Sequence, residues 1–593
     1  MANEVRPSKV LCISDRCGIC TFKALDGEQV AIVNIRDGTT LTTYDYKREV
    51  IRQDRRNGFK YHFLGCLFWY QRAARSVVLC HTDCLARERS TSSAGRFWAT
   101  MYAYDPPPAE VKRHERWLLA QFALSLRSIS EQGPVPLPLE ICEMIAQHCC
   151  PVTALRRNAA DAGRALWEKY GSDDQVRSTH TFDIATKAWA RYVEFEGVQY
   201  IGCITNRPED TPDQQAPLAS ELTLLYTPLP DDAVDTLYIV EDHLGVRNII
   251  FTSSLTNSEI HHNYDGASVH WRRLKIIPGT RFRCNTDNTK LRSLDLVFPQ
   301  APESVGLPSV SDSEDAFDRP PRPNQKLRAH NTFEWDDHPF RMTSFVCNDP
   351  RTAGYSVFCF RQPWAILPHM PPRGERDLEV YAAQERRKSG GAVWLYASRN
   401  PDEVITEIWV RVQDGGYEAR RSVAIVTATY TWFDTTSMRY YLRTNQDRTL
   451  VMGPYPHKGH HVYTLVYRGG SDPSRIYVDT GDRGLRRFLF ESPLPAEPNS
   501  TNSSSAVPND DAQKPKGLPS PKSPCPIPIY VDEARAPFIF YSSADMYGVA
   551  KVTLCRPEQG TISGMVLRYH DGRQETLGQV RPDRLASSGR RYE

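Results

Sequence analysis

Two pairs of metal-type side chains stand near the start of the chain. Cys17 and Cys20 form a Cys-x-x-Cys pair in "RCGIC", and His81 and Cys84 form a His-x-x-Cys pair in "VVLCHTDC", about sixty residues later. Zinc in proteins prefers four sulfur or nitrogen donors arranged as a tetrahedron. The sequence therefore predicts one structural zinc site built from both pairs, because four protein donors would leave no open position for a catalytic water.

Other interpretations of these cysteines stay open. Cys12, Cys66 and Cys80 lie in the same part of the chain, and one of them could replace a ligand or begin a second site. All of these cysteines could also be buried reduced thiols, since free cysteine is among the most buried residue types. A redox role for the Cys-x-x-Cys pair is not favoured, because no βαβ pattern surrounds it.

The elements around the two pairs must bring them together. The β-branched run "SVVLC" predicts a strand that leads into His81, with Cys84 in the first turn of a following helix. This arrangement resembles the closing half of RING, LIM and related treble-clef zinc fingers. The gap between Cys20 and His81 is longer than in a compact finger, so an inserted hairpin made of "QVAIVNI" and "TTLTTYDY" is expected between the two halves.

Composition narrows the class of protein. The chain has 593 residues, 40% of them apolar, and a formal net charge of +2. The near balance of charge gives no basis for nucleic-acid binding, and no run of about 18 apolar residues predicts a membrane helix. The start "MANEVRPSKVLC" lacks the apolar core of a signal peptide, so the 15 cysteines are expected to be reduced thiols in the cytoplasm or nucleus. The sequence leaves the oligomeric state open.

A helical segment is predicted over 106–175. Apolar residues recur at helical spacing after "DPPP", and the pattern continues through "PLEICEMIAQHCC" to about residue 169. One apolar face is expected to contain Leu139, Cys142, Ile145, Ala146 and Cys149. The opening Leu-Pro, the charged residue soon after it and the later Trp167 resemble an F-box.

An F-box resemblance implies docking to the Skp-type adaptor of a cullin ubiquitin ligase, with the rest of the chain selecting substrates. Leu137, Leu139 and Ile145 would then face solvent in the free chain, because the adaptor supplies the other half of the core. The alternative is a plain helical hairpin packed beneath the β region. The order of modules, with "EDHLGVRNIIF" and "ISGMVLRYHDGRQETLGQVR" in the β region, resembles a group of large fungal proteins labelled F-box-like.

The remainder of the chain is predicted to be β. Short runs rich in aromatic and β-branched residues alternate with turn residues from about residue 178. The expected fold class is α+β, predominantly β, with a sandwich-like, prism-like or propeller-like region. The predicted domains are a Cys/His module (1–105), the helical segment (106–175), a β domain (176–490) with a loose loop (299–325), a disordered linker (491–528) and a C-terminal β segment (529–593) that docks on the β domain.

Residues outside the Cys/His pairs suggest little other chemistry. Two histidine clusters could hold a catalytic metal, one at His261, His262 and Asp265 and the other at His457, His460 and His461. No Gly-x-Ser-x-Gly elbow, phosphate loop or His-Glu-x-x-His motif is present. Strand cadences such as "MVLRYHDGRQETLGQV" resemble jacalin-like lectins, which implies carbohydrate binding. We expect a non-enzymatic interaction or adaptor protein, with a carbohydrate-binding protein as the alternative and a metal-dependent enzyme third.

Overall fold

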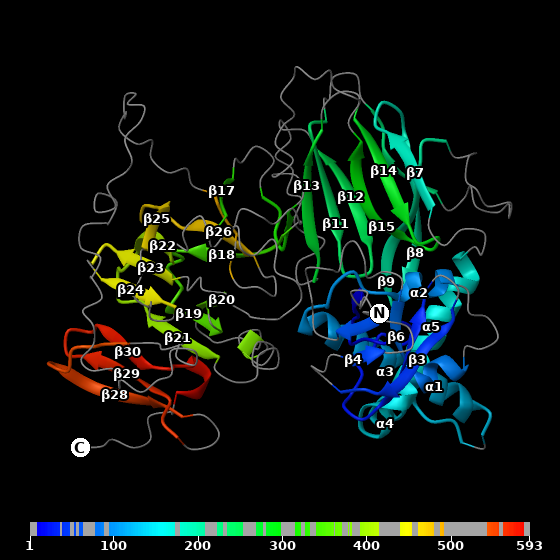
Figure 1. Cartoon of the computed structure of the whole chain (residues 1–593), viewed down its shortest axis with the longest axis horizontal. Coiled ribbons are helices and arrows are strands. Elements are labelled where there is room, and N and C mark those ends of the chain that lie inside the picture. The colour runs from blue at the N-terminus through cyan, green and yellow to red at the C-terminus, as the bar shows by residue number, and fades with distance from the viewer. Residues whose placement is uncertain are drawn as a thin grey trace, which may run out of the picture. The chain divides into compact units, whose positions relative to one another are not determined.

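The chain folds into two compact units, Met1–Asn324 and Gln325–Glu593. The computed structural model describes residues 9–35, 38–47, 52–54, 59–62, 77–87, 94–133, 135–171, 178–207, 222–228, 234–252, 268–276, 280–297, 315–321, 327–331, 340–360, 362–370, 378, 380–381, 392–413, 439–446, 448–453, 461–479, 485, 487–491, 542–556 and 561–585. Strands predominate among these residues, in agreement with the expected predominantly β fold class (Figure 1). The division between the units falls inside the stretch 176–490 that the sequence predicted as one β domain.

The first unit begins with the Cys/His module. Its strands are β1 (Lys9–Cys12), β2 (Gln29–Asn34), β3 (Thr40–Asp45), β4 (Arg52–Asp54), β5 (Phe59–His62) and β6 (Val77–His81). They form two sheets, in the orders β3-β2-β6 and β1-β5-β4. The antiparallel pair β2 and β3 is the hairpin that the sequence predicted between the ligand pairs. Strand β2 is apolar throughout its centre because Ala31 and Val33 pack in one cluster while Val30 and Ile32 pack in another.

Helices follow the module. They are α1 (Thr82–Arg87), α2 (Ala94–Thr100), α3 (Pro108–Glu131), α4 (Leu139–Cys149) and α5 (Val152–Tyr170). Pro107, Pro138 and Pro151 stand immediately before α3, α4 and α5, where the fixed φ of proline suits a helix start and its missing N–H is not needed. Within the described parts of the chain, every helix is too short or too polar to cross a membrane.

Three groups of strands complete the first unit around one core. The strands are β7 (Ser178–Asp183), β8 (Ala188–Phe195), β9 (Val198–Thr205), β10 (Leu222–Tyr226), β11 (Thr236–Glu241), β12 (Val246–Thr252), β13 (His270–Lys275), β14 (Arg281–Thr286), β15 (Leu291–Val297) and β16 (Ala316–Phe317). Their orders are β10-β8-β9, β15-β14-β7 and β12-β11-β13-β16. Buried residues of all three groups meet in one cluster, among them Phe182, Ile201 and Ile239. Hairpin turns of these strands point toward α2 and α3 (Figure 1).

Part of the predicted loose loop 299–325 is packed, and the sequence prediction is wrong for this part. Trp271 of β13 pairs with Phe317 of β16, and Phe317 is 3% exposed. The Tyr238 hydroxyl donates a hydrogen bond of 2.7 Å to the Pro321 carbonyl. The stretch was predicted to be loose because it is rich in proline and acidic residues. It nevertheless contains one short apolar pair, Ala316 and Phe317, that extends a sheet.

The second unit also has several sheets around a shared core. Its strands are β17 (Arg328–Asn331), β18 (Arg341–Cys347), β19 (Gly354–Phe360), β20 (Gln362–His369), β21 (Val393–Ser398), β22 (Ile405–Gln413), β23 (Arg439–Thr444), β24 (Thr449–Met452), β25 (His461–Arg468), β26 (Ser474–Asp479), β27 (Arg487–Phe490), β28 (Val549–Cys555), β29 (Gly564–Tyr569) and β30 (Gln574–Gly578), followed by a short 3-10 turn, η6 (Pro582–Arg584). The orders are β18-β26-β27-β17, β20-β19-β21, β24-β23-β22-β25 and β28-β29-β30. The first three groups enclose one core that includes Val357, Val410 and Ile476.

The C-terminal sheet β28-β29-β30 packs against β21 and the turn after it. The Thr576 hydroxyl donates to the Tyr396 carbonyl at 2.5 Å, and the Ser398 hydroxyl donates to the Gln574 carbonyl at 2.9 Å. The Gln574 amide donates to Asn400 Oδ1 at 2.9 Å. These contacts give the last strands their partners within the second unit.

Cleavage of the chain within 495–525 is therefore expected to leave the C-terminal strands bound to the rest of the second unit. A small sheet needs a covered hydrophobic face to be stable, and the buried side chains of this sheet pack against Tyr396 of β21, so the strands gain from staying attached. Size-exclusion chromatography after cleavage at an inserted protease site should show the two pieces eluting together under native conditions. A C-terminal piece that elutes separately and stays soluble would contradict this expectation.

Candidate metal centre

Cys17, Cys20, His81 and Cys84 meet in one buried cluster. Their donor atoms all lie within 4.8 Å of one another. His81 Nδ1 lies 3.4 Å from Cys20 Sγ and 3.8 Å from Cys84 Sγ. In a tetrahedral site with metal–sulfur bonds of ~2.3 Å and metal–nitrogen bonds of ~2.1 Å, neighbouring donors lie about 3.6–3.8 Å apart. The residues present thus fit a metal ion in both number and spacing.

The backbone around Cys17 and Cys20 forms a tight turn against β6. The Gly18 amide donates to the Leu79 carbonyl at 2.8 Å, and the Thr21 amide donates to the Cys17 carbonyl at 2.9 Å. A Cβ atom at Gly18 would lie 2.4 Å from Val78 Cγ2, so the close approach of this turn to β6 requires glycine. The turn thereby holds the first ligand pair beside the strand that ends in His81.

The second ligand pair is presented by a strand end and a helix start. His81 is the last residue of β6 and Cys84 lies in the first turn of α1. Two residues separate them, and the bend from strand to helix brings Cys84 Sγ to 3.8 Å from His81 Nδ1. The four side chains are strongly buried, with exposed fractions of 1% for Cys17, 0% for Cys20, 4% for His81 and 8% for Cys84.

Hydrogen bonds favour an anionic sulfur at Cys17. Its Sγ accepts backbone N–H groups from Ile19 at 3.5 Å and from His81 at 3.4 Å. Burial raises the pKa of Cys17, but hydrogen bonds from Cys20, Cys80, Cys84 and His81 bring the pKa well below its usual range. Hydrogen bonding to Cys17 raises the pKa of Cys84 to about 12. A bound cation would displace the protons from these thiols, because the thiolate is the form of cysteine that binds metal.

Glu28 and Arg156 lie beside the Nε2 side of the His81 imidazole, opposite the cysteine sulfurs. His81 Nε2 lies 3.4 Å from Glu28 Oε2. Arg156 of α5 donates to both carboxylate oxygens of Glu28, at 2.8 and 3.2 Å. Burial raises the pKa of Glu28, but the hydrogen bonds from Arg156 outweigh this effect and lower it. A carboxylate on the second ring nitrogen orients a metal-ligating histidine, so these two residues belong to the site although the sequence did not indicate them.

Cys80 is not a member of the four-donor group. It precedes His81 in β6 and is buried in the same apolar cluster as Cys17. Burial raises the pKa of the Cys80 thiol well above its usual range, which favours the neutral form. The side chain of Cys12 and the whole of Cys66 lie outside the described residues. In the part of the chain that the structure describes, the Cys17, Cys20, His81 and Cys84 cluster is the one group found that could hold a metal ion.

The two histidine clusters considered as alternative metal sites fall on residues of which little is described. His261, His262, Asp265, His457 and His460 lie outside the described residues. His461 begins β25, but its side chain is not described. A catalytic metal at these positions remains a hypothesis from the sequence.

The three residues predicted to bind a partner differ in exposure. Leu137 is 38% exposed, whereas Leu139 and Ile145 are half-buried. Leu139 packs beside Ala123 of α3 and Ala146 of α4, so the expectation that it faces solvent is wrong in part. The predicted apolar face of α4 also needs one correction, because Cys149 is exposed.

Comparisons with protein-family models, with curated proteins and with solved structures find no match to this chain.

Proposed function

We propose that this chain is a non-enzymatic interaction protein whose N-terminal unit is held together by a structural zinc ion. In this proposal, the start of α4 and the residues around it form the docking surface for a Skp-type adaptor. The observation that carries the proposal is the exposure of apolar side chains on α4, while the opposite face of the same helix is packed.

The donor set supports zinc as the metal. Three thiolates and one imidazole are typical of structural zinc sites, and softer sulfur donors disfavour magnesium and calcium. All four donors come from the protein and are buried, which leaves no coordination position for water or substrate. A stabilising role therefore accounts for the site better than a catalytic one.

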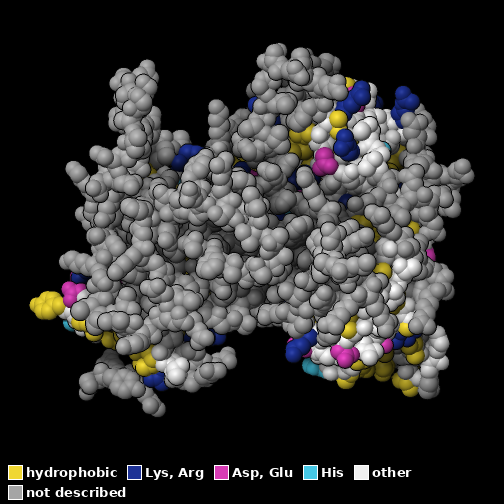
Figure 2. Space-filling view, viewed as in Figure 1, with side chains coloured by type: hydrophobic (Ala, Val, Ile, Leu, Met, Phe, Trp, Pro, Cys, Tyr) yellow, Lys and Arg dark blue, Asp and Glu magenta, His cyan; other side chains and the backbone are white. Residues whose placement is uncertain are grey.

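Exposed apolar residues gather around α4. We call these residues the α4 surface: Ile129, Val135, Leu137, Ile141 and Met144. Ile141 is 42% exposed and Met144 is 56% exposed. Figure 2 shows hydrophobic side chains gathered at the lower edge of the first unit, where Figure 1 places α4. Contiguous exposed apolar side chains often mark a site for a protein partner.

The other face of α4 is already occupied within the unit. Cys142 and Ala146 are 0% and 1% exposed and pack against Ala123 of α3. The α4 surface is thus separate from the intramolecular core of the helical segment. It overlaps the Leu-Pro start and the first helix by which the sequence resembles an F-box, and this overlap is our reason for assigning a Skp-type adaptor as the occupant.

Substituting Ile141→Ser together with Met144→Ser is expected to weaken adaptor binding at least tenfold and to change the melting temperature little. Interface residues at the centre of an apolar contact typically contribute ~1–2 kcal/mol or more each, whereas exposed residues add little to folding. Binding of a purified Skp-type adaptor to the full chain would be measured by surface plasmon resonance, alongside calorimetry.

The matched control is Glu140→Gln with Glu143→Gln, since both glutamates are exposed on the same helix. This variant should bind the adaptor as the unmodified chain does. The proposal fails if the unmodified chain binds no adaptor at micromolar concentration, or if the serine variant binds as tightly as the control.

A further inference from the structure

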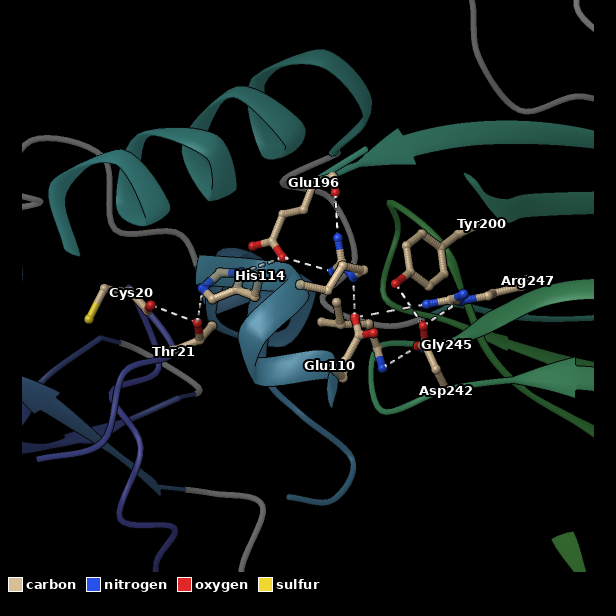
Figure 3. A network of polar contacts seen from close by, with 11 residues as sticks. Cys20, Thr21, Glu110, His114, Glu196, Tyr200, Asp242, Gly245 and Arg247 are labelled. Atoms are coloured by element: carbon tan, nitrogen blue, oxygen red, sulfur yellow. Dashed lines mark hydrogen bonds and ion pairs between the residues drawn. The ribbon is translucent and has the colours of Figure 1, made fainter. Parts of the chain in front are cut away.

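A buried polar chain begins at the metal centre and runs into the β strands of the first unit (Figure 3). Thr21 follows the ligand Cys20, and its hydroxyl donates to the Cys20 carbonyl at 2.6 Å and lies 3.4 Å from His114 Nε2. His114 of α3 places Nδ1 at 2.7 Å from Glu196 Oε2. Glu196 lies in the turn between β8 and β9. Three consecutive contacts thus join a ligand of the centre to a β turn.

The chain continues along α3 to a second β turn. Arg113 donates to the Glu196 carbonyl at 2.8 Å and to Glu110 Oε1 at 2.6 Å. Glu110 Oε1 lies 3.9 Å from Arg247 Nη2, and Arg247 donates to Asp242 Oδ2 at 2.6 Å. Asp242 follows β11, at the start of the turn to β12. Each carboxylate in this series has a cationic or imidazole partner, as a buried network requires.

A third β turn makes equivalent contacts with the C-terminal end of α2 and the residue that follows this helix. Lys290 donates to the Ala99 carbonyl and lies 3.2 Å from Asp287 Oδ2. Arg292 donates to the Met101 carbonyl at 2.6 Å. The turns β8–β9, β11–β12 and β14–β15 therefore each hold a buried carboxylate whose contacts lead to α2 or α3, the helices that follow the Cys/His module. We call these three turns the support of the Cys/His module.

The conformation of Thr21 indicates that this support matters for the metal centre. Thr21 has a φ of +64°, a left-handed conformation that β-branched residues rarely adopt. Such a conformation persists only where surrounding contacts hold it. Arg16 donates to the Thr21 carbonyl at 3.1 Å, and the Thr21 hydroxyl lies between the Cys20 carbonyl and His114. The turn that carries Cys17 and Cys20 thus depends on a histidine that Glu196 positions.

We infer that the Thr21–His114–Glu196 contacts couple metal binding at the Cys/His centre to the β turns of the first unit. His114 and Glu196 are positioning residues: they touch no metal donor, but they fix the ligand turn. Because such coupling is reciprocal, metal binding also holds the β11–β12 turn more firmly. This inference rests on metal binding as proposed above, and not on the adaptor.

The test compares Glu196→Gln with Glu194→Gln in the full chain loaded with zinc. Glu194 lies two residues earlier on β8 and is exposed, so it is a matched control. Outer contacts of metal sites typically alter metal affinity 10- to 100-fold. Zinc transfer to an excess of a coloured chelator should be about tenfold faster or more from Glu196→Gln, and unchanged from the control.

Hydrogen exchange gives a second readout that is independent of the variants. In the unmodified chain, removing zinc should speed amide exchange over 236–252 as well as over the ligand segments.

His114→Asn serves if Glu196→Gln does not fold, because the asparagine amide replaces Nδ1 and keeps a partner for Glu196 while losing contact with Thr21. This variant should release zinc faster, and its amide exchange over 236–252 should no longer respond to zinc.

The outcomes distinguish a failure of the coupling alone from a failure of the metal site. A chain that carries zinc, releases it equally from both glutamate variants and shows exchange changes only over 13–35 and 77–87 would overturn the coupling and leave the metal site standing. A folded chain that binds no zinc at all would overturn the metal site and the coupling together.

Discussion

Cys17→Ser is expected to remove zinc from the chain and to unfold the Cys/His module. Cys17 is one of the four donors, and its Sγ accepts two backbone N–H groups. Structural zinc sites contribute an apparent ~10–16 kcal/mol to folding in zinc-finger peptides, while whole domains are stable by only ~5–15 kcal/mol. Loss of a ligand therefore removes a contribution comparable to the total stability of the unit.

Metal analysis of the purified variant and circular dichroism at increasing temperature would measure both effects. The unmodified chain should carry about one zinc ion per molecule. Cys80→Ala is the control, because Cys80 is an equally buried neighbour that is not among the four donors. If Cys80→Ala loses zinc while Cys17→Ser retains it, the ligand set described above is incorrect.

Arg247→Met is expected to destabilise the first unit by about 3–5 kcal/mol, the usual cost of leaving a buried charge without its partner. Arg247 is 9% exposed and Asp242 is 4% exposed. Burial raises the pKa of Asp242, but the charge of Arg247 outweighs this effect and lowers the pKa below its usual value. Burial likewise lowers the pKa of Arg247, but the charge of Asp242 raises it above its usual value. Both residues are thus charged in the folded chain and depend on each other.

Urea unfolding followed by tryptophan fluorescence would measure the loss of stability. Arg283→Met is the matched control, because Arg283 is exposed on β14 and the same side-chain replacement there should change stability by less than about 0.5 kcal/mol. Equal midpoints for the two variants would mean that the network contributes nothing to folding. Methionine keeps much of the length of arginine, so a large loss would reflect the missing charge rather than a cavity.

The four residues of the candidate metal centre could be predicted from the sequence because the pattern that indicates them is local. A Cys-x-x-Cys turn and a His-x-x-Cys pair at a strand–helix junction each place two donors by short-range geometry alone, and the structure brings both pairs together. The strand-rich character of the chain was predictable for the same reason, since alternation and turn residues are local patterns.

The surroundings of the site could not be predicted because they depend on tertiary packing. Glu28 and Arg156 meet across 128 residues, and no spacing rule connects a carboxylate in a turn with an arginine on a later helix. His114 and Glu196 are likewise joined only by the fold. The boundary near residue 324 was missed because strand patterns do not reveal which core a strand enters.

The Cys/His module and its support lie far apart in the sequence, and this separation affects how the chain folds during translation. The Ala99 and Met101 carbonyls receive their hydrogen bonds from Lys290 and Arg292, 191 residues later in synthesis. During translation, the module therefore leaves the ribosome long before the turns that complete it exist. Contacts of such long sequence separation form slowly and leave apolar surface exposed in the meantime. A nascent chain that captures zinc early would keep the two ligand pairs together through this interval, so zinc supply during synthesis would influence the yield of folded protein in addition to its final stability.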